Sequence, residues 1–304
     1  MPNWCSNALH VRGNTDEAQN VIDSLLDGSI EDRTTEMTYK LRKMLLAGLS
    51  GLLHPHTSTP PELLEAVGQL NPALVVSSRR NSLESLAYTQ FLLELVDGVI
   101  TPERYSHINR IYDQSNLANV WYGDIPKPIR KKMAHMWRTC QYDFSGMFNR
   151  NIATWWSKPR VWQPEQTASS FNIQLMYELP VCVMVNGFNG GHLSCSTEYS
   201  FNCNVIGIKW TTLNIELIEN GNWVFDTPWS PPMGLLDAIP NYVAKQLGAE
   251  PDSELVDITL YYYESGCAFQ GINDEVFEYI CDYDDESDEW TSNLLPEIEL
   301  AFFG

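Results

Sequence analysis

Histidine and cysteine side chains that could bind a metal ion occur in one short stretch of the sequence. His192, Cys195 and Cys203 have the spacing His-x2-Cys-x7-Cys in a glycine-rich segment. A structural zinc site needs four ligands, usually presented as close pairs, so a fourth ligand would have to come from a distant part of the chain. Cysteines in strands also pack as small apolar side chains. We therefore predict that the chain binds no metal ion and needs no cofactor.

A nucleophilic cysteine needs a histidine close by in space. Cys140 follows His135 by five residues, which puts the two side chains on different faces of a helix. Residues 264–271 match neither the Walker pattern nor GxGxxG, and their glycines predict a strand connection with close backbone approach. We predict no catalytic residue and expect that the protein is not an enzyme. A metal-dependent nuclease or a protein-modifying enzyme is the alternative.

An acidic run with two aromatic residues lies near the C-terminus. Its members are Asp282, Tyr283, Asp284, Asp285, Glu286, Asp288, Glu289 and Trp290. Arrayed carboxylates can imitate phosphates, and Tyr and Trp are typical anchors in protein interfaces. We predict that this run binds a partner protein. The alternatives are a solvated acidic loop and an acidic DNA mimic of the anti-restriction kind.

The negative charge of the chain is concentrated in its last third. The net charge of the whole chain is −20. Residues 211–304 hold twenty acidic residues and one basic residue, so they carry −19, and residues 1–210 carry −1. Such a surface repels nucleic acid and attracts basic surfaces. Direct nucleic-acid binding is therefore not expected. The alternative is that the negative charge serves only the solubility of the protein.

A basic stretch lies in the middle of the chain, where residues 126–137 read as a helix. It contains Lys127, Arg130, Lys131 and Lys132, with tryptophans interleaved further on. We predict that this stretch supports self-association, so that the protein forms a homo-oligomer or a large assembly on its target. Cys281 beside the acidic run is a thiol that could link copies under oxidising conditions. A solvated face, an outside partner and a nucleic-acid binder for plasmid maintenance are the alternatives.

Hydrophobic periodicity predicts an α+β fold. Residues 5–12 alternate as a strand with Cys5, Asn7, Leu9 and Val11 on one side, and a helix follows from residue 15. From about residue 31 to residue 150 the pattern is helical. Strands are predicted at 171–177, 181–185, 199–208, 213–218, 223–225, 255–263 and 276–283, with a helix at 234–247.

Two stretches carry a resemblance to a known family. The N-terminus reads Met-Pro-Asn-Trp-Cys-Ser-Asn, and the last third contains Thr-Pro-Trp-Ser-Pro-Pro and Tyr-x-Glu-x-Gly-x-x-Phe-x-Gly. Together they resemble a phage- and plasmid-borne family with a ferredoxin-like domain. The resemblance implies a split ferredoxin-like module formed by residues 1–30 and 205–304. Residues 31–204 would then be an inserted helical region followed by a β-rich segment.

The resemblance implies a mobile genetic element as the source, and proteins of such elements often antagonise host defence. The size, the helical insertion and the acidic last third are also similar to the phage inhibitor of the Gabija nuclease–helicase complex. We therefore expect a protein that binds and inhibits a host antiviral defence complex stoichiometrically. The N-terminus lacks the pattern of a secretory signal and no segment reads as a membrane span, so the host cytoplasm is the expected location.

Overall fold

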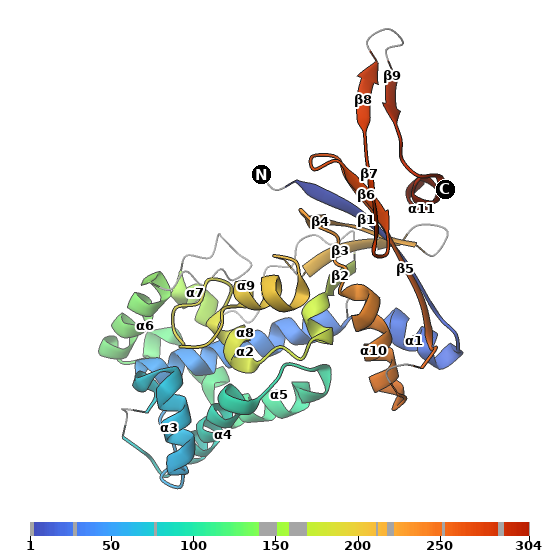
Figure 1. The fold of residues 1–304 in the computed structure, drawn as a ribbon. Coiled ribbons are helices and arrows are strands. Elements are labelled where there is room, and N and C mark those ends of the chain that lie inside the picture. The colour runs from blue at the N-terminus through green and yellow to red at the C-terminus, as the bar shows by residue number, and fades with distance from the viewer. Residues whose placement is uncertain are drawn as a thin grey trace. The chain divides into compact units, whose positions relative to one another are not determined.

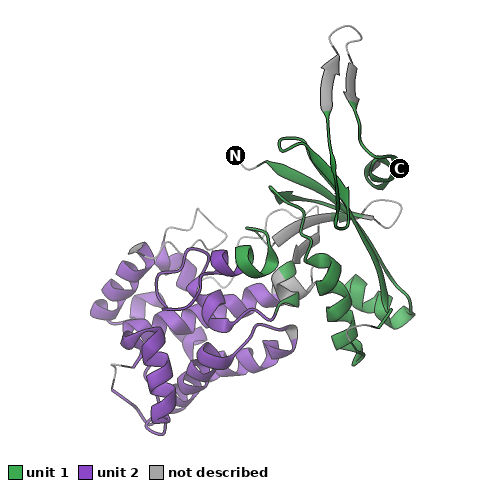
Figure 2. Cartoon of the chain, viewed as in Figure 1, with its two compact units in different colours: residues 1–31, 166–177, 202–304 green, residues 32–165, 178–201 purple. Residues whose placement is uncertain are grey.

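The chain is arranged as two compact units in a computed structural model (Figures 1 and 2). The structure describes residues 3–26, 29–75, 78–139, 151–157, 169–210, 212–217, 222–250, 253–284 and 289–303. Unit 1 consists of residues 1–31, 166–177 and 202–304, and unit 2 of residues 32–165 and 178–201. Helices and antiparallel strands both contribute, which confirms the predicted α+β class.

Unit 1 is built on a seven-stranded sheet with the order β2-β3-β4-β1-β5-β6-β7. Its strands are β1 (Trp4–Gly13), β2 (Ser169–Asn172), β3 (Thr212–Leu217), β4 (Asn222–Pro228), β5 (Val256–Glu264), β6 (Phe269–Ile272) and β7 (Glu275–Glu278). β8 (Cys281–Asp284) and β9 (Glu289–Ser292) form a separate hairpin. The helices of unit 1 are α1 (Asp16–Leu26), α10 (Leu235–Leu247) and α11 (Pro296–Phe303).

The first strand lies at the centre of this sheet. β1 pairs antiparallel with β4, with Cys5 opposite Thr227, and antiparallel with β5, with Leu9 opposite Leu260. Both neighbours belong to the last third of the chain, so the N-terminal strand completes a sheet whose other parts follow the insertion. With the helices between α1 and β3 and the edge strand β2 left out, the elements β1-α1-β3-β4-α10-β5 form a β-α-β-β-α-β succession on an antiparallel sheet.

Alternation along β1 separates a buried face from a more exposed one. Cys5, Asn7, Leu9 and Val11 are all buried, as the sequence pattern predicts, because side chains alternate along a strand. α1 and α10 contact each other and cover the sheet at β1 and β5 (Figure 1). Gly248, with φ of 65°, ends α10 in the left-handed conformation that favours glycine.

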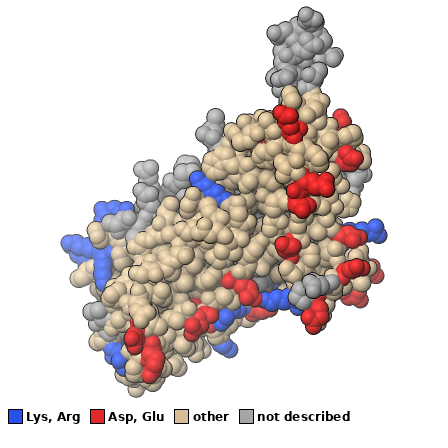
Figure 3. Space-filling view, viewed as in Figure 1, with Lys and Arg blue, Asp and Glu red and all other residues tan. Residues whose placement is uncertain are grey.

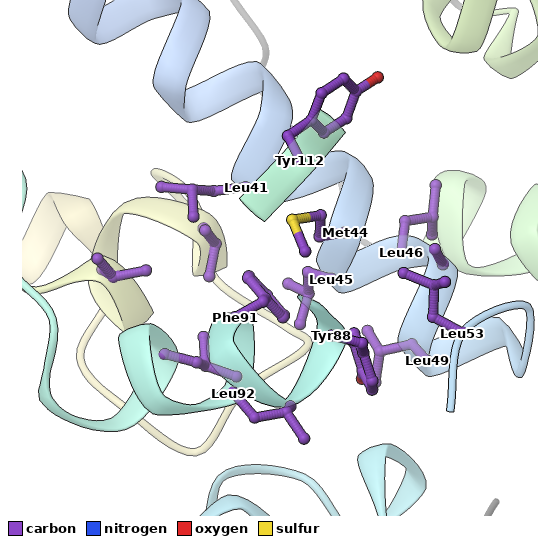
Figure 4. Close-up of a cluster of buried hydrophobic side chains, with 14 of the residues drawn as sticks. Leu41, Met44, Leu45, Leu46, Leu49, Leu53, Tyr88, Phe91, Leu92 and Tyr112 are labelled. Atoms are coloured by element: carbon purple, nitrogen blue, oxygen red, sulfur yellow. The ribbon is translucent and has the colours of Figure 1, made fainter. Parts of the chain in front are cut away.

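Helices form unit 2. They are α2 (Ser29–Ser50), which begins in unit 1, α3 (Pro61–Leu70), α4 (Leu83–Asp97), α5 (Tyr105–Gln114), α6 (Lys127–Thr139), α7 (Ile152–Ser157), α8 (Val181–Asn186) and α9 (Glu198–Phe201). Figure 4 shows the core, where α2 presents Met44, Leu45 and Leu49 to α4. Tyr88 and Phe91 of α4 stack with their ring centroids 5.7 Å apart. This apolar contact gives unit 2 a hydrophobic core of its own.

Two of the predicted strands are wrong, and a third, at 171–177, is wrong for most of its length because Ile173–Met176 forms a 3₁₀ helix after β2. Residues 181–185 form most of α8, and residues 199–208 include most of α9 and a short π-helix, Asn202–Ile206. Valine-rich runs favour strands, but every residue of α8 except Cys182 is buried, and tertiary packing overrides intrinsic propensity. The segment expected to be β-rich is therefore helical between residues 181 and 206, with β2 as the strand before it.

Across the part of the chain that the structure describes, every helix is too short or too polar to cross a lipid bilayer.

Candidate protein-binding surface

Three exposed tryptophans and one lysine form a cluster on unit 1. Trp4, Trp210 and Trp229 have 50%, 38% and 45% of their surface exposed. The ring centroids of Trp4 and Trp210 are 5.9 Å apart. The ammonium of Lys209 lies 5.1 Å from the ring centroid of Trp210 and 5.3 Å from that of Trp229. We call this set the tryptophan surface.

The ends of two paired strands place Trp4 and Trp229 together. Trp4 begins β1 opposite Pro228, the last residue of β4, and Trp229 follows directly. The backbone N–H of Trp229 donates to the carbonyl oxygen of Asn3 at 2.9 Å. Because this bond extends the strand pairing by one step, it fixes the backbone on which both indoles are mounted.

A buried hydrogen-bond network supports this end of the sheet. The Asn7 amide donates to the hydroxyl oxygen of Thr227 at 2.9 Å and to the carbonyl oxygens of Cys5 at 2.8 Å and Phe225 at 3.2 Å. The Thr227 hydroxyl donates to the carbonyl oxygen of Ser230 at 2.7 Å, which closes the turn that carries Trp229. Asn7 and Thr227 are completely buried, where polar groups with satisfied hydrogen bonds specify one arrangement.

Trp229 has an unusual backbone conformation. Its φ is +67°, in the left-handed region that bulky side chains rarely adopt. Such a conformation costs on the order of 1–3 kcal/mol and persists where the surrounding structure enforces it. Here the bonds from Trp229 to Asn3 and from Thr227 to Ser230 enforce it. A strained backbone that keeps a large apolar ring half exposed is a feature typical of binding sites.

Lys209 and Trp210 come from the connection between the π-helix and β3. The Asn202 amide is buried and donates to the carbonyl oxygen of Lys209 at 3.2 Å, which anchors this connection. The Lys209 ammonium then lies against two indoles, and such cation–π contacts hold both partners in place. The result is a preorganised surface of apolar rings around one positive charge.

The glycine-containing motif after β5 forms a tight connection to β6. The buried Glu264 carboxylate accepts hydrogen bonds from the backbone N–H groups of Gly266, at 3.0 Å, and Cys267. A side chain at Gly266 would collide with the side chain of Asn3, and one at Gly271 would collide with Tyr262. The prediction of a strand connection with close backbone approach is confirmed. The motif shapes the same end of the sheet that carries the tryptophan surface.

The predicted partner-binding run, residues 282–290, lies on the β8–β9 hairpin. The strands pair Asp282 with Thr291, Tyr283 with Trp290, and Asp284 with Glu289. Residues 285–288, which include Asp285, Glu286 and Asp288, lie outside the described residues. The run is thus placed on a hairpin of unit 1, and its role in binding stays a prediction.

The residues predicted to support self-association are divided between the two units. Lys127, Arg130, Lys131 and Lys132 lie on α6 of unit 2, and Cys281 begins β8 of unit 1. Figure 3 shows Lys and Arg side chains gathered where α6 lies, and Asp and Glu side chains scattered over unit 1. Two of the interleaved tryptophans, Trp155 and Trp156, are buried in the core of unit 2 and cannot stack on nucleic-acid bases.

The candidate metal ligands are not brought together. His192 and Cys195 belong to unit 2, and Cys203 belongs to unit 1. Among the residues with described placement, no three His, Cys, Asp or Glu side chains are grouped so that they could hold a metal ion. Burial lowers the pKa of His192 to about 4, so this imidazole is neutral at physiological pH.

Sequence reasoning missed the tryptophan surface because it treated most tryptophans as core residues. A signal was present, since Trp4 and Trp229 lie inside the two most specific motifs and Trp229 is flanked by Pro228 and Ser230. Proline-rich turns stay at the surface, so a tryptophan within one is a candidate for exposure. The pairing with Lys209 and Trp210 depends on the tertiary structure.

Three comparisons relate the chain to known proteins. The family described as "Protein of unknown function (DUF1281)" matches residues 37–210. The "Uncharacterized protein YubA" of Escherichia coli (strain K12) is 26% identical over 161 residues, which cover 52% of this chain and 91% of that protein. The crystal structure of a protein api92 from Yersinia pseudotuberculosis is similar, with a TM-score of 0.65 and 20% identity, over 93% of this chain and 99% of that one.

Proposed function

The chain belongs to the DUF1281 family, and we propose that it is a phage or mobile-element protein that binds and inhibits a host antiviral defence complex without catalysing a reaction. The observation that carries the proposal is the tryptophan surface. Exposed large apolar side chains that are grouped and rigidly held mark interaction sites.

The chemistry of the tryptophan surface suits a protein partner. Aromatic side chains bury 150–250 Å² each when covered, and tryptophan is among the residues most enriched in binding hot spots. Because hydrogen bonds fix the backbone that carries Trp4 and Trp229, little backbone entropy remains to be lost at these residues on binding. We expect the three indoles to form the desolvated centre of the interface.

Charge supports a protein partner over a nucleic acid. Residues 211–304 carry −19, and Lys245 is their one basic residue. Stacking platforms for single strands combine aromatic rings with a positively charged groove, which this charge distribution does not supply around Lys209. A partner with a basic rim around an apolar centre would be attracted to this surface and held by it.

The finer proposal concerns the target. The motif resemblance favours a mobile element, and the size, the helical unit and the acidic last third are similar to the phage inhibitor of the Gabija nuclease–helicase complex. We therefore propose a complex of this kind as the target, in the cytoplasm of the host cell. The acidic run at residues 282–290 favours a second candidate, a DNA mimic of the anti-restriction kind.

The test uses the full chain and a purified Gabija complex. The wild-type chain should bind it and abolish its activity at a fixed molar ratio. Chelator added to the binding step should leave binding unchanged. The double variant Trp4→Ala/Trp229→Ala should weaken binding by at least about tenfold, which corresponds to about 1.4 kcal/mol. Trp121→Ala is the matched control, because Trp121 is 68% exposed on unit 2, outside the tryptophan surface.

The other outcomes are separable. Turnover of the target by a substoichiometric amount of the chain, or loss of action with chelator, would favour the enzyme alternative. Inhibition of a restriction enzyme that depends on the acidic run, with no contribution from the indoles, would favour the DNA mimic. Equal binding by the double variant and the wild type would remove the tryptophan surface from the proposal.

A further inference from the structure

One edge of the sheet in unit 1 is open. Among the strands that the structure describes, β7 is at the end of the order and pairs with β6 alone. All four residues of β7 are exposed, with 64% of the surface of Val276 and 40% of that of Phe277 accessible to solvent. Successive side chains of a strand point to opposite faces, so both faces of β7 are exposed as well as its edge.

Hydrogen bonds around β7 show which of its backbone groups point outward. The Tyr279 N–H donates to the carbonyl oxygen of Ala268 at 3.1 Å, so the backbone of Tyr279 faces the β6 side. The facing direction alternates along an antiparallel pair, and Phe277 therefore also faces β6, opposite Gln270. By the same alternation, the N–H and C=O groups of Val276 point away from β6.

The following part of the chain covers this outer edge only up to one point. The Asn293 side-chain amide donates to the carbonyl oxygen of Glu278 at 3.1 Å, and the Asn293 N–H donates to the carbonyl oxygen of Ile280 at 3.1 Å. Beyond Asn293 the chain turns into α11. Within the described residues, the backbone groups of Val276 have no protein partner, so an added strand could form a pair of ladder hydrogen bonds there.

The side chains beside the open edge favour a basic partner. Asp274, Val276 and Glu278 lie on one face of the strand, and Glu275 and Phe277 lie on the other. Residues directly opposite each other on paired strands attract when their charges differ and repel when they are alike. A second copy of β7 centred on Val276 would set Asp274 against Glu278 twice. Charge therefore disfavours pairing between two copies and favours an extended segment with lysine or arginine opposite these carboxylates.

We propose that the β7 edge binds an extended basic segment of a partner protein as an additional antiparallel strand. The central residue of the segment exchanges two hydrogen bonds with Val276, and the Glu278 N–H supplies a third. Main-chain bonds give affinity in this mode of recognition, and alternate side chains give specificity. The sequence that best matches Glu278 to Asp274, read in the direction of the partner, is Lys-Val-Val-Lys-Lys. Because β5 and β6 lie between this edge and β1, the site is separate from the tryptophan surface.

The test titrates the isotope-labelled full chain with the acetylated and amidated peptide Lys-Val-Val-Lys-Lys, and follows the amide signals of β7 by NMR. The Kd should be on the order of 1 mM, because few bonds form and the free peptide is unordered. Methylation of the second valine nitrogen should weaken binding by at least about tenfold, since that N–H donates to the carbonyl oxygen of Val276. Methylation of the first valine nitrogen is the matched control, because that N–H points away from β7.

Two variants of the chain test the edge and its charge separately. Val276→Pro removes the outward N–H without breaking a bond to β6, a position at which edge strands accept proline. It should weaken binding by at least about tenfold while the amide signals of β5 stay in place. Glu275→Lys/Glu278→Lys should exchange the preference, so that Glu-Val-Val-Glu-Lys binds better than Lys-Val-Val-Lys-Lys.

The comparison of the two methylated peptides uses the wild-type chain, so it does not depend on the folding of any variant. Equal binding of the two methylated peptides would overturn the proposal, as would the absence of signal changes with about 5 mM of the unmethylated peptide. Equal binding of Lys-Val-Val-Lys-Lys by Val276→Pro and the wild type would also overturn it. A dimer of the chain in sedimentation experiments that Val276→Pro dissociates would assign the edge to a second copy instead.

Discussion

The Asn7 amide donates a hydrogen bond of 2.9 Å to the hydroxyl oxygen of Thr227, a residue 220 positions further along the chain. Both residues are completely buried, in neighbouring strands β1 and β4. Their bond joins the N-terminal motif to the Thr-Pro-Trp-Ser-Pro-Pro motif under the tryptophan surface. The two motifs, although far apart in the sequence, therefore form one hydrogen-bonded unit of the structure.

Replacing this amide by a carboxylate should destabilise the sheet of unit 1. Asn7→Asp would leave an acceptor facing the carbonyl oxygens of Cys5 and Phe225, and we expect a loss of about 3 kcal/mol in the free energy of unfolding. Urea unfolding of the full chain measures it. Ser6→Ala removes the neighbouring exposed bond to Asp226 and should change stability by less than about 0.5 kcal/mol. Equal effects of the two variants would contradict this account.

Trp229→Gly should separate binding from folding. Glycine adopts a φ of +67° without strain, and this relief offsets the lost cation–π contact with Lys209. We expect the melting temperature to stay within a few degrees of the wild type, while affinity for the partner falls by at least about tenfold. Calorimetry and binding titration measure the two effects. A variant that unfolds would show that the ring serves stability more than recognition.

Neutralising the β8–β9 hairpin should slow association. The strand register places Asp284 opposite Glu289, and like charges at directly opposed positions destabilise a strand pair. Asp284→Asn with Glu289→Gln should leave folding unchanged or slightly improved. The association rate with a basic partner should fall, most strongly at low salt, because surface charges steer encounter. Stopped-flow measurements at two ionic strengths test this, with Glu62→Gln on α3 of unit 2 as a single-charge control. Unchanged rates would mark the run as a solvated loop.

Lys43 should make the stability of unit 2 depend on pH. Its ammonium is buried, donates to the carbonyl oxygen of Trp156 at 3.1 Å and lies 4.6 Å from the centroid of that ring. Burial lowers the pKa of Lys43 to about 8 from its ordinary value of 10.5. Between these values the unfolded chain binds more protons, so the contribution of Lys43 to the free energy of unfolding rises with pH.

Across the whole range between the two pKa values, the contribution of Lys43 to the free energy of unfolding would change by about 3 kcal/mol. The aromatic faces that stabilise the ammonium reduce this change. Lys43→Met should therefore be more stable than the wild type at pH 7, and its advantage should shrink as the pH rises from about 8 to 10. Urea unfolding at a series of pH values measures it. Lys132→Met on the exposed face of α6 controls for the loss of one charge. A stability difference between Lys43→Met and the wild type that does not change with pH would refute the lowered pKa of Lys43.

Gly48 should resist replacement by alanine. In the middle of an exposed helix this change stabilises by about 1 kcal/mol, since glycine is the poorer helix former. Here an added methyl group would collide with the ring of Tyr88, which is completely buried in the core of unit 2. We expect Gly48→Ala to destabilise by about 1–3 kcal/mol. Pairing it with Tyr88→Phe should recover part of the loss, because the hydroxyl makes the closest contact. Stabilisation by Gly48→Ala alone would contradict the packing.

The sequence by itself determined the elements whose burial pattern is local. Alternation of Cys5, Asn7, Leu9 and Val11 predicts β1, and the spacing of Ala18, Ile22 and Leu25 predicts the buried face of α1. The α+β class follows from such patterns. The same reasoning gave a wrong prediction for residues 181–185, because a short valine-rich run is compatible with a strand or a buried helix. Packing in unit 2 determines that this run is a helix.

Only the tertiary structure decided which side chains meet. β1 pairs with β4 and β5 because the buried faces of these strands complete one sheet, whatever the length of the intervening chain. That pairing places Trp229 beside Trp4, and the connection before β3 adds Lys209 and Trp210. The sequence records that these residues are aromatic or basic. Exposure, proximity and backbone strain are properties of contacts between distant segments, so a local pattern cannot contain them.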